Sequence, residues 1–340
     1  MTECQPAAKD VAGPAAASAG PKIIHRLAVG LTVVVFPLIW VGGLVTTYDA
    51  GMAVPDWPTT YGWNMFAYPL STWLSGPFDL MVEHSHRLLG SMAGLVAIAL
   101  LIVAYRYDGR PWFVGWCVLL LLAVIAQGIL GGVRVLFDER VIAKVHGCVG
   151  PAFFAMAAVT ATMASSWWRR GAWQQVATGA GGRKRTVAVI SSVLLAIVFL
   201  QLVLGAQLRH LTGWETHRQF TALTHAHLGT AGLLAVGVVV VALLAWLLGV
   251  ERSVRRPAMA LVGLVLVQLA LGGGTWIVNY ALPWQELNKM LASYTIHAKG
   301  FVESLIITAH MATGSLILAV TAVTVARAWR CRWVALRGSP

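Results

Sequence analysis

The sequence predicts an all-α integral membrane protein whose eight transmembrane helices form two pseudo-symmetric four-helix bundles. Of its 340 residues, 58% are hydrophobic and only 11% are charged, a composition typical of membrane proteins. Eight apolar runs are long enough to cross ~30 Å of hydrocarbon as helices of about 20 residues. Their apolar character is continuous and does not alternate, so helices and not barrel strands satisfy the backbone. The predicted spans are 27–48, 82–105, 112–133, 143–166, 187–208, 223–249, 257–280 and 301–326.

An internal repeat divides the chain into two halves of four helices. The odd-numbered helices end in small residues, and each even-numbered helix begins with a histidine. The predicted organisation is a disordered cytoplasmic tail at 1–25, an N-terminal half at 26–168, a cytoplasmic linker at 169–186, a C-terminal half at 187–328 and a second cytoplasmic tail at 329–340.

The net charge of +12 indicates membrane topology and not nucleic-acid binding. If the N-terminus lies inside, the inner segments hold 17 of the 25 basic residues, and the positive-inside rule then places both termini in the cytoplasm. The first 21 residues lack the apolar core of a cleaved signal and the Arg-rich character of a mitochondrial presequence. A bacterial plasma membrane is therefore the expected location.

Four histidines occupy matching positions of the repeat: His86, His146, His227 and His310. Aligning residues 83–86 with residues 224–227 superposes the first and third, and aligning 146–150 with 310–314 superposes the other two. All four even-numbered helices start at the outer face, so the imidazoles are expected at similar depth, two in each half. One histidine in a membrane helix can be a packing residue, but four repeated histidines indicate a ligand.

Two histidines per half suit the two axial positions of a haem. Neutral imidazole also binds zinc or copper, but those sites usually gather three or four protein ligands. None of the four cysteines pairs at disulfide or zinc-site spacing. The glycines that close the odd-numbered helices either make room for a macrocycle or let helices approach closely. Outer cations are candidates for pairing with haem propionates or for anchoring to lipid headgroups; they are Arg87, Arg134 and Arg209.

One carboxylate distinguishes the halves. Glu83 lies three residues before His86, so the two share a helix face, whereas His84 points elsewhere. Thr224 replaces Glu83 in the second half. Charged groups in membrane helices usually mark function, so the pattern predicts one working site and one electron-transferring or structural site.

The first outer loop contains Pro55-Asp56-Trp57-Pro58. Its prolines and aromatic rings suit a fixed cap over the outer end of the first half. The alternative for Trp57, Tyr61 and Trp63 is a belt of aromatics at the membrane interface.

These features resemble the haem A synthase family over residues 25–328. The resemblance rests on the two four-helix halves, on Glu83-x-x-His86-Arg87, on the three later histidines and on the loop segment 55–58. It implies that haem O, the substrate, binds between His86 and His146, and that a resident haem b binds between His227 and His310.

The resemblance further implies the reaction and its partners. Glu83 would act in oxidising the C8 methyl group of haem O to the formyl group of haem A, through an alcohol and a hydrated aldehyde. Arg87 and Arg134 would help to bind the haem, and the product would serve terminal oxidase biogenesis. Implied partners are a haem O synthase and an electron-transfer protein.

Two features depart from the family pattern or leave an assignment open. Many bacterial members have a cysteine pair flanking the loop segment, where this chain has Val54 and Thr60, so a disulfide-dependent electron or haem-transfer step in that loop cannot be assumed. His225 lies two residues before His227 and competes with it as a ligand.

Two other functions remain open from the sequence. A di-haem b-type electron carrier would use the same four histidines without changing the porphyrin. A transporter or haem permease would explain the internal repeat. A homo-oligomer through lipid-facing helices is also left open.

Overall fold

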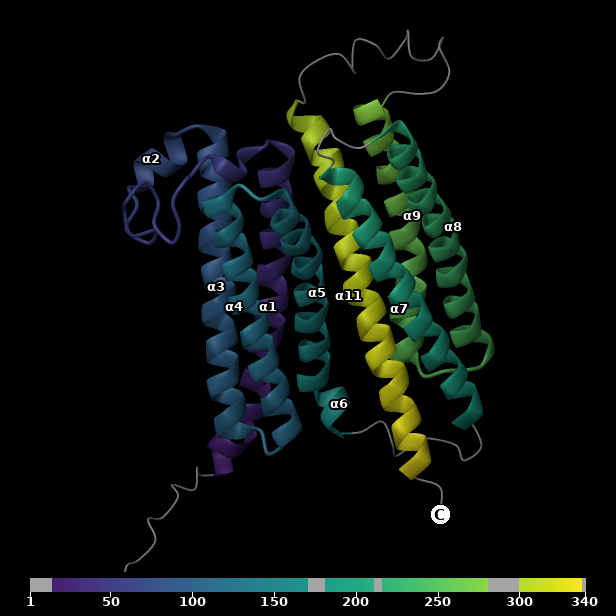
Figure 1. Ribbon diagram of the computed structural model, residues 1–340. Helices are drawn as coiled ribbons and strands as arrows, with labels where there is room; N and C mark the ends of the chain where they lie inside the picture. Colours follow the sequence, from purple (N-terminus) through teal and green to yellow (C-terminus); the bar gives the residue numbers. More distant parts are fainter. Residues whose placement is uncertain (1–13, 171–180, 211–215, 281–299, 338–340) are drawn as a thin grey trace, which may run out of the picture.

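The computed structural model describes residues 14–170, 181–210, 216–280 and 300–337. Eight helices within these ranges are long and apolar enough to cross a membrane, which confirms the predicted fold class (Figure 1). They are α1 (Pro14–Thr47), α3 (Phe78–Tyr107), α4 (Pro111–Phe137), α5 (Arg140–Ala164), α7 (Gly181–Arg209), α8 (His217–Leu247), α9 (Arg252–Tyr280) and α11 (Phe301–Arg337). Three short helical segments connect them: η1 (Ala50–Met52), α2 (Leu70–Ser75) and α6 (Ser166–Arg170).

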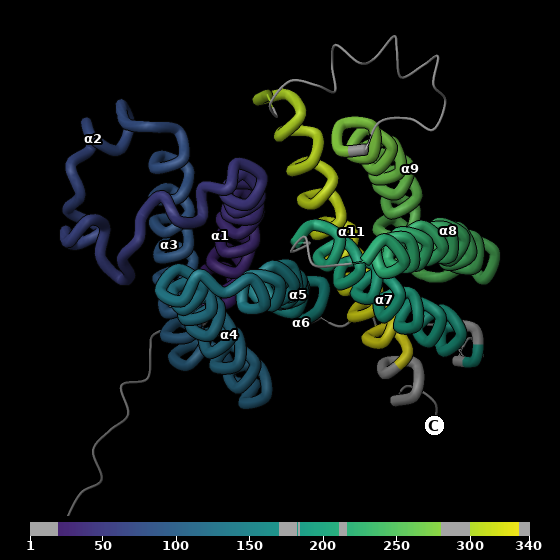
Figure 2. The backbone as a smooth tube through the Cα atoms, turned by 45° about the horizontal axis from the view of Figure 1, so that its top comes forward, coloured from purple at the N-terminus to yellow at the C-terminus, as the bar shows by residue number. Residues whose placement is uncertain are grey.

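The long helices form two bundles, as predicted. Helices α1, α3, α4 and α5 make the N-terminal bundle, and α7, α8, α9 and α11 make the C-terminal one. Figure 2 shows the two groups side by side, with α5 and α11 between them. We call the end that holds η1 and α2 the loop end, and the end where α1 begins and α11 ends the termini end (Figure 1).

Helix boundaries correct the predicted tails and linker. Helix α1 begins at Pro14, so residues 14–25 are helical and not part of a disordered tail. Proline is favoured at a first helical position, and the alanines that follow are the best helix formers. Helix α11 continues to Arg337, well into the predicted tail at 329–340, because no glycine or proline follows Gly314 before Gly338. In the predicted linker, 169–186, residues 169–170 belong to α6 and residues 181–186 belong to α7. Residues 171–180 lie outside the described chain.

Acidic residues occupy equivalent turns at the termini end. Asp108, between α3 and α4, forms ion pairs with Arg110 at 2.8 Å and Arg169 at 2.7 Å. Burial opposes its ionisation, but the hydrogen bonds and charge of Arg110, with the charge of Arg169, hold its pKa below the usual value. Glu251, between α8 and α9, accepts hydrogen bonds from Trp167 of α6 and from the Cys331 thiol. Trp167 therefore connects the two bundles at this end.

At the loop end the bundles meet along α1. A Cβ on Gly43 would lie 2.7 Å from the Thr308 side chain of α11, so only glycine permits this approach. Arg209 of α7 donates to the Gly43 carbonyl at 2.6 Å and to the Thr47 hydroxyl at 2.9 Å. The relative position of the two halves is thus fixed next to the histidines.

Candidate functional site

The structure brings the four repeated histidines together in two pairs. The rings of His86 and His146 lie 6.2 Å apart at 73°, and those of His227 and His310 lie 6.5 Å apart at 65°. The first pair joins α3 to α5, and the second joins α8 to α11. His225 is exposed on α8, whereas His227 is partly buried. The geometry therefore favours His227 over His225 as the partner of His310.

Each histidine ring lies against a glycine of the preceding long helix. A Cβ on the glycine would lie 2.7 to 3.3 Å from Cε1 of the ring at all four places. The glycine–histidine pairs are Gly42–His86, Gly131–His146, Gly205–His227 and Gly272–His310. The glycine repeat thus gives the imidazoles room to lie at the helix interface.

The second glycine of two of these motifs has a different use. Gly43 faces α11, and Gly132 faces the indole of Trp57. Both readings of the glycines therefore apply: the first glycine of a doublet accommodates a histidine, and the second permits close packing of another element.

The two pairs fit the axial positions of a haem. With a metal–imidazole bond of about 2 Å on each side, ring centres about 6 Å apart are expected for a metal between two histidines, and both pairs meet this value. Nδ1 of His146, His227 and His310 is buried and has no hydrogen-bond partner among the described residues. No cluster of three or more His, Cys, Asp or Glu side chains suited to a metal ion occurs in the described chain. A macrocycle that brings its own equatorial ligands fits this donor set.

If the first pair holds a haem, filling the glycine next to His86 is expected to weaken its binding. Gly42→Ala places a methyl group 2.7 Å from the ring, which forces the imidazole to move. We expect haem retention at that pair to fall about tenfold, the lower range for changes that disturb a ligand's orientation. Gly30→Ala is the control, because nothing lies within 4 Å of its Cβ on the same helix. Haem per protein after purification is the measurement, and equal retention in the two variants would contradict the prediction.

Glu83 is buried at the loop end and bonded through both oxygens. It is 3% exposed, three residues before His86 on α3. Oε1 accepts from Arg87 at 2.8 Å, and Oε2 accepts from the Val54 backbone N–H at 2.9 Å. The carboxylate is therefore fixed between the helix and the first loop.

Arg87 clamps the same loop. Its guanidinium donates to the carbonyl oxygens of Asp56, Thr59 and Val54, at 2.6 to 2.9 Å, in addition to Glu83. These contacts use both terminal nitrogens of the guanidinium to hold the loop and Glu83. The sequence predicted that Arg87 lies at the outer end of its helix, but it could not predict which loop atoms the guanidinium contacts.

The loop segment 55–58 has a structural explanation for its two central residues. The Asp56 carboxylate accepts the backbone N–H of Tyr61 and of Gly62, both at 2.8 Å. Partial burial opposes ionisation, yet these bonds lower the pKa of Asp56 below its usual value. Tyr61 and Gly62 have positive φ angles of 50° and 78°, which L residues rarely adopt. The two hydrogen bonds from their N–H groups to Asp56 stabilise this turn.

Trp57 seals the loop against α4. Its indole lies on Gly132, where any side chain would overlap it. Tyr61 and Trp63 are half exposed. Trp57 is therefore part of the loop that caps the first half. A position at the membrane interface remains an alternative for Tyr61 and Trp63.

His84 points away from the histidine pairs, as predicted. Its ring is 1% exposed, bonds to the Thr60 hydroxyl at 3.2 Å and contacts the rings of Tyr68 and Trp73. His84 thus helps to anchor the first loop.

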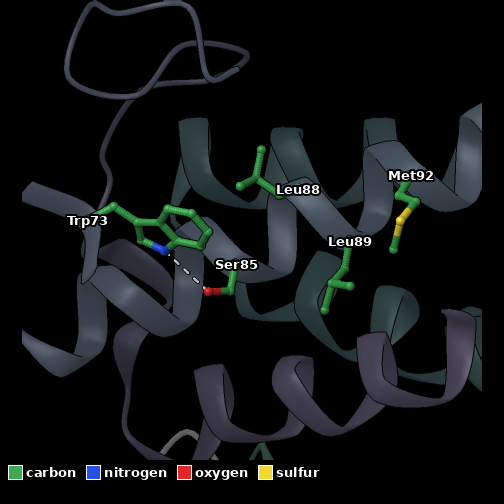
Figure 3. A pocket seen from close by; sticks show the side chains of 5 residues that line it. All are labelled: Trp73, Ser85, Leu88, Leu89 and Met92. Carbon is green, nitrogen blue, oxygen red and sulfur yellow. Dashed lines mark hydrogen bonds between the residues drawn. The ribbon is translucent and has the colours of Figure 1, made fainter. Parts of the chain in front are cut away.

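An apolar cavity of about 340 Å³ lies between Trp73 of α2 and helix α3 (Figure 3). The indole N–H donates to the Ser85 hydroxyl at 3.2 Å, and the other lining residues are Leu88, Leu89 and Met92. None of the four paired histidines lines this cavity.

Arg134 differs from Arg87. Its guanidinium lies against Gly51 of η1, and it makes no hydrogen bond or ion pair with another described residue.

His210, at the end of α7, lies beside Gly147, the residue after His146. Burial, with the neighbouring charges of Arg209 and Arg134, lowers the pKa of His210 to about 4, so it is neutral at pH 7. Trp214, Glu215 and His297 lie outside the described residues.

Sequence reasoning missed three glutamines beside the histidines. Gln127, Gln201 and Gln268 each lie four residues before the glycine that receives a histidine ring. The signal was present as a repeated Gln-x-x-x-Gly, with Leu38-x-x-x-Gly42 at the fourth position.

The fold and the described residues of the site define a multi-pass membrane protein with two histidine pairs, the first of which has a carboxylate, Glu83, three residues before one of its histidines on α3. Residues 25–225 match the COX15-CtaA family, described as cytochrome oxidase assembly protein. Because the match covers more than half of the chain, the chain belongs to this family, that of the haem A synthases. The match spans the first half and ends in α8, before His227. Comparison with individually curated proteins gave no match.

Proposed function

We propose that this protein is a haem A synthase that oxidises the C8 methyl group of haem O to a formyl group. The reaction passes through an alcohol and a hydrated aldehyde that loses water. Family membership supports a role in cytochrome oxidase assembly. The observation that supports the specific reaction is the asymmetry of the site: two similar histidine pairs, with buried Glu83 next to only one of them.

In the first half, the chain binds and orients the substrate haem. His86 and His146 hold its iron, and Arg134, whose guanidinium has no other described partner, pairs with a propionate. The carboxylate of Glu83 either stabilises positive charge that develops at the reacting methyl carbon or accepts its proton. Arg87 and the Val54 N–H keep the Glu83 oxygens in place, which limits the reorganisation that the reaction requires.

In the second half, His227 and His310 hold a resident haem b, which supplies a route for electrons leaving the first site. Thr224 occupies the position of Glu83 and is 8% exposed. A hydroxyl there lacks the charge and basicity that the methyl oxidation requires. The second pair thus binds without carrying out the same chemistry.

The membrane orientation belongs to the same proposal. Basic residues concentrate at the termini end, including Arg110 and Arg169, which pair with Asp108. Together with the positive-inside rule, this supports both termini in the cytoplasm and the loop end outside, and the proposed location is a bacterial plasma membrane. Haem O would be supplied by a haem O synthase, and a separate electron-transfer partner would accept electrons.

Co-expression with a haem O synthase tests the reaction. The protein is purified in detergent, and its extracted haems are identified by chromatography and mass. Haem A or its alcohol intermediate beside haem b is the expected result. Haem O that remains unmodified in the presence of bound haem b would contradict the proposal.

The second candidate is a di-haem b-type electron carrier without porphyrin chemistry. The observation that favours it is that both Glu83 oxygens already accept hydrogen bonds from the loop and Arg87, as in a purely structural ion pair. Recovery of haem b alone, in cells that supply haem O, would select this candidate.

A further inference from the structure

Arg209 ends helix α7 at the boundary between the two bundles. It is partly buried and closes the membrane span Lys184–Arg209. Its side chain reaches α1 of the first half, where Nη2 donates to the Gly43 carbonyl at 2.6 Å and to the Thr47 hydroxyl at 2.9 Å. Both acceptors are neutral, so they hold the guanidinium without balancing its charge.

The positive charge of Arg209 has no counter-charge in the described part of the chain. The ion pairs found there are formed by Glu83 and Asp108 with other arginines. Nη1 and Nε of Arg209, which carry three of the five guanidinium N–H groups, form no hydrogen bond with a described residue. An unpaired cation at the end of a membrane span is costly, so this position is suited to an anionic ligand.

Helix geometry places Arg209 next to the second histidine pair. It follows Gly205, which lies against the His227 ring, by four residues. It is therefore on the same face of α7 and about 6 Å nearer to the loop end. A haem held by this pair directs its ionised carboxylates towards that aqueous end, because a carboxylate in hydrocarbon is costly. Arg209 lies in the same direction.

The other ligand of the second pair is connected to Arg209 through α1. Gly43, whose carbonyl accepts from Arg209, packs against Thr308 and Met311 of α11. These two residues lie on either side of His310 in the sequence. The charge of Arg209 also acts on the His310 ring. The guanidinium is thus close to the surroundings of both ligands.

Arg134 has a similar relation to the first pair. It follows Gly131, which lies against the His146 ring, by three residues, and its charge acts on that ring. Each half therefore has a cation without a described counter-charge, one helical turn beyond a glycine that accommodates a histidine. Arg209 differs because it also binds the other half.

We propose that Arg209 binds a propionate carboxylate of the resident haem through Nη1 and Nε, while its Nη2 joins this haem site to α1 of the first half. The inference rests on the proposed haem ligation. It assigns Arg209 to haem binding and not to a lipid headgroup. Gly42, next to Gly43 on α1, lies against the His86 ring, so Arg209 connects the resident haem to the helix that accommodates a ligand of the substrate.

The first test is the midpoint potential of the resident haem in the full-length protein, purified from cells without haem O. Its spectral component is identified as the one that His310→Ala removes. In Arg209→Leu we expect the ferric-to-ferrous ratio at a fixed potential to rise about tenfold, a fall of about 59 mV in the midpoint potential. The reason is that a positive charge near the iron opposes its oxidation. Arg209→Lys keeps the charge and should recover part of the potential.

Two variants separate carboxylate binding from the fastening of helices. Thr47→Val removes one acceptor of Nη2 on α1 and leaves the cation in place, so the potential should remain that of the unaltered protein. Arg218→Leu removes an exposed cation from the first turn of α8, at the same end of the bundle. It should have no effect either, because water and salt screen an exposed charge.

The propionate itself provides a second readout. Haem that is isotope-labelled at its propionate carboxyl carbons gives identifiable carboxylate bands in redox-induced infrared difference spectra. We expect these bands to shift in Arg209→Leu and to stay unchanged in Arg218→Leu. Haem loss to excess apomyoglobin should also be at least about tenfold faster in Arg209→Leu, because a charge-assisted hydrogen bond is lost.

Arg209→Leu protein that matches Arg218→Leu in potential, infrared bands and haem loss would overturn the carboxylate contact and leave the haem ligation intact. A shift in Thr47→Val as large as that in Arg209→Leu would also overturn it and assign Arg209 to fastening α1 alone. The expected Arg209 effects in a protein that leaves haem O unmodified would refute only the proposed reaction. Unaltered protein that binds no haem would overturn both proposals together.

Discussion

Glu83→Gln is expected to bind both haems and yet to lose conversion of haem O, by about 10² to 10⁴-fold, the range for removal of an acid–base group. The amide has the same shape, so it can still accept the Val54 N–H that the carboxylate accepts at 2.9 Å. It can neither take up a proton nor balance positive charge at the methyl carbon. The measurement is the rate of alcohol and haem A formation, normalised to bound haem.

Two variants make this prediction sharp. Asp79→Asn removes another carboxylate from the first turn of the same helix, where Asp79 accepts the backbone N–H of Leu80, and should leave conversion unchanged. Glu83→Asp keeps the charge at a shorter reach and should recover part of the rate. Normal conversion in Glu83→Gln would remove Glu83 from the reaction and leave it as an anchor of the loop.

His227→Ala is expected to abolish binding of the resident haem. The substitution removes one ring of the pair whose centres lie 6.5 Å apart and leaves His310 without a partner. The optical spectrum of the reduced protein should lose the component of the second half, and haem b per protein should fall accordingly. Conversion should fall as well, because the proposed electron route is gone.

His225→Ala is the matched control, since it removes an exposed imidazole two residues away on the same helix. Full retention of haem b is expected there. Loss of the haem in His225→Ala, with retention in His227→Ala, would reverse the assignment.

The histidine pairs could be predicted from sequence because a repeat compares the chain with itself. Matching His86 with His227 and His146 with His310 required only register, and helix geometry then placed the rings at one depth. The glycine repeat was equally visible in the sequence, but the different neighbours of its individual glycines were not. Nothing in the letters distinguishes Gly42, which faces a histidine, from Gly43, which faces the other bundle.

The contacts of the first loop could not be predicted, because they join residues distant in sequence through backbone atoms. Arg87 looked like a propionate partner, yet three loop carbonyls accept its hydrogen bonds. Carbonyl positions depend on backbone conformation, which includes the left-handed residue Tyr61. The glutamines were missed for another reason: a single glutamine in a membrane helix has many explanations, and the contacts of Gln201 and Gln268 with histidine rings appear only in the folded structure.

The central claim is that the two histidine pairs hold different haems, a substrate in the first half and a resident haem in the second. The most direct measurement is the haem content of His146→Ala and His310→Ala, each co-expressed with a haem O synthase and compared with the unaltered protein. The account predicts that His146→Ala retains haem b and yields no haem A or alcohol. It predicts that His310→Ala loses haem b while haem O remains bound. Equal loss of both haems from both variants, in protein that is still folded, would contradict it and indicate one shared site.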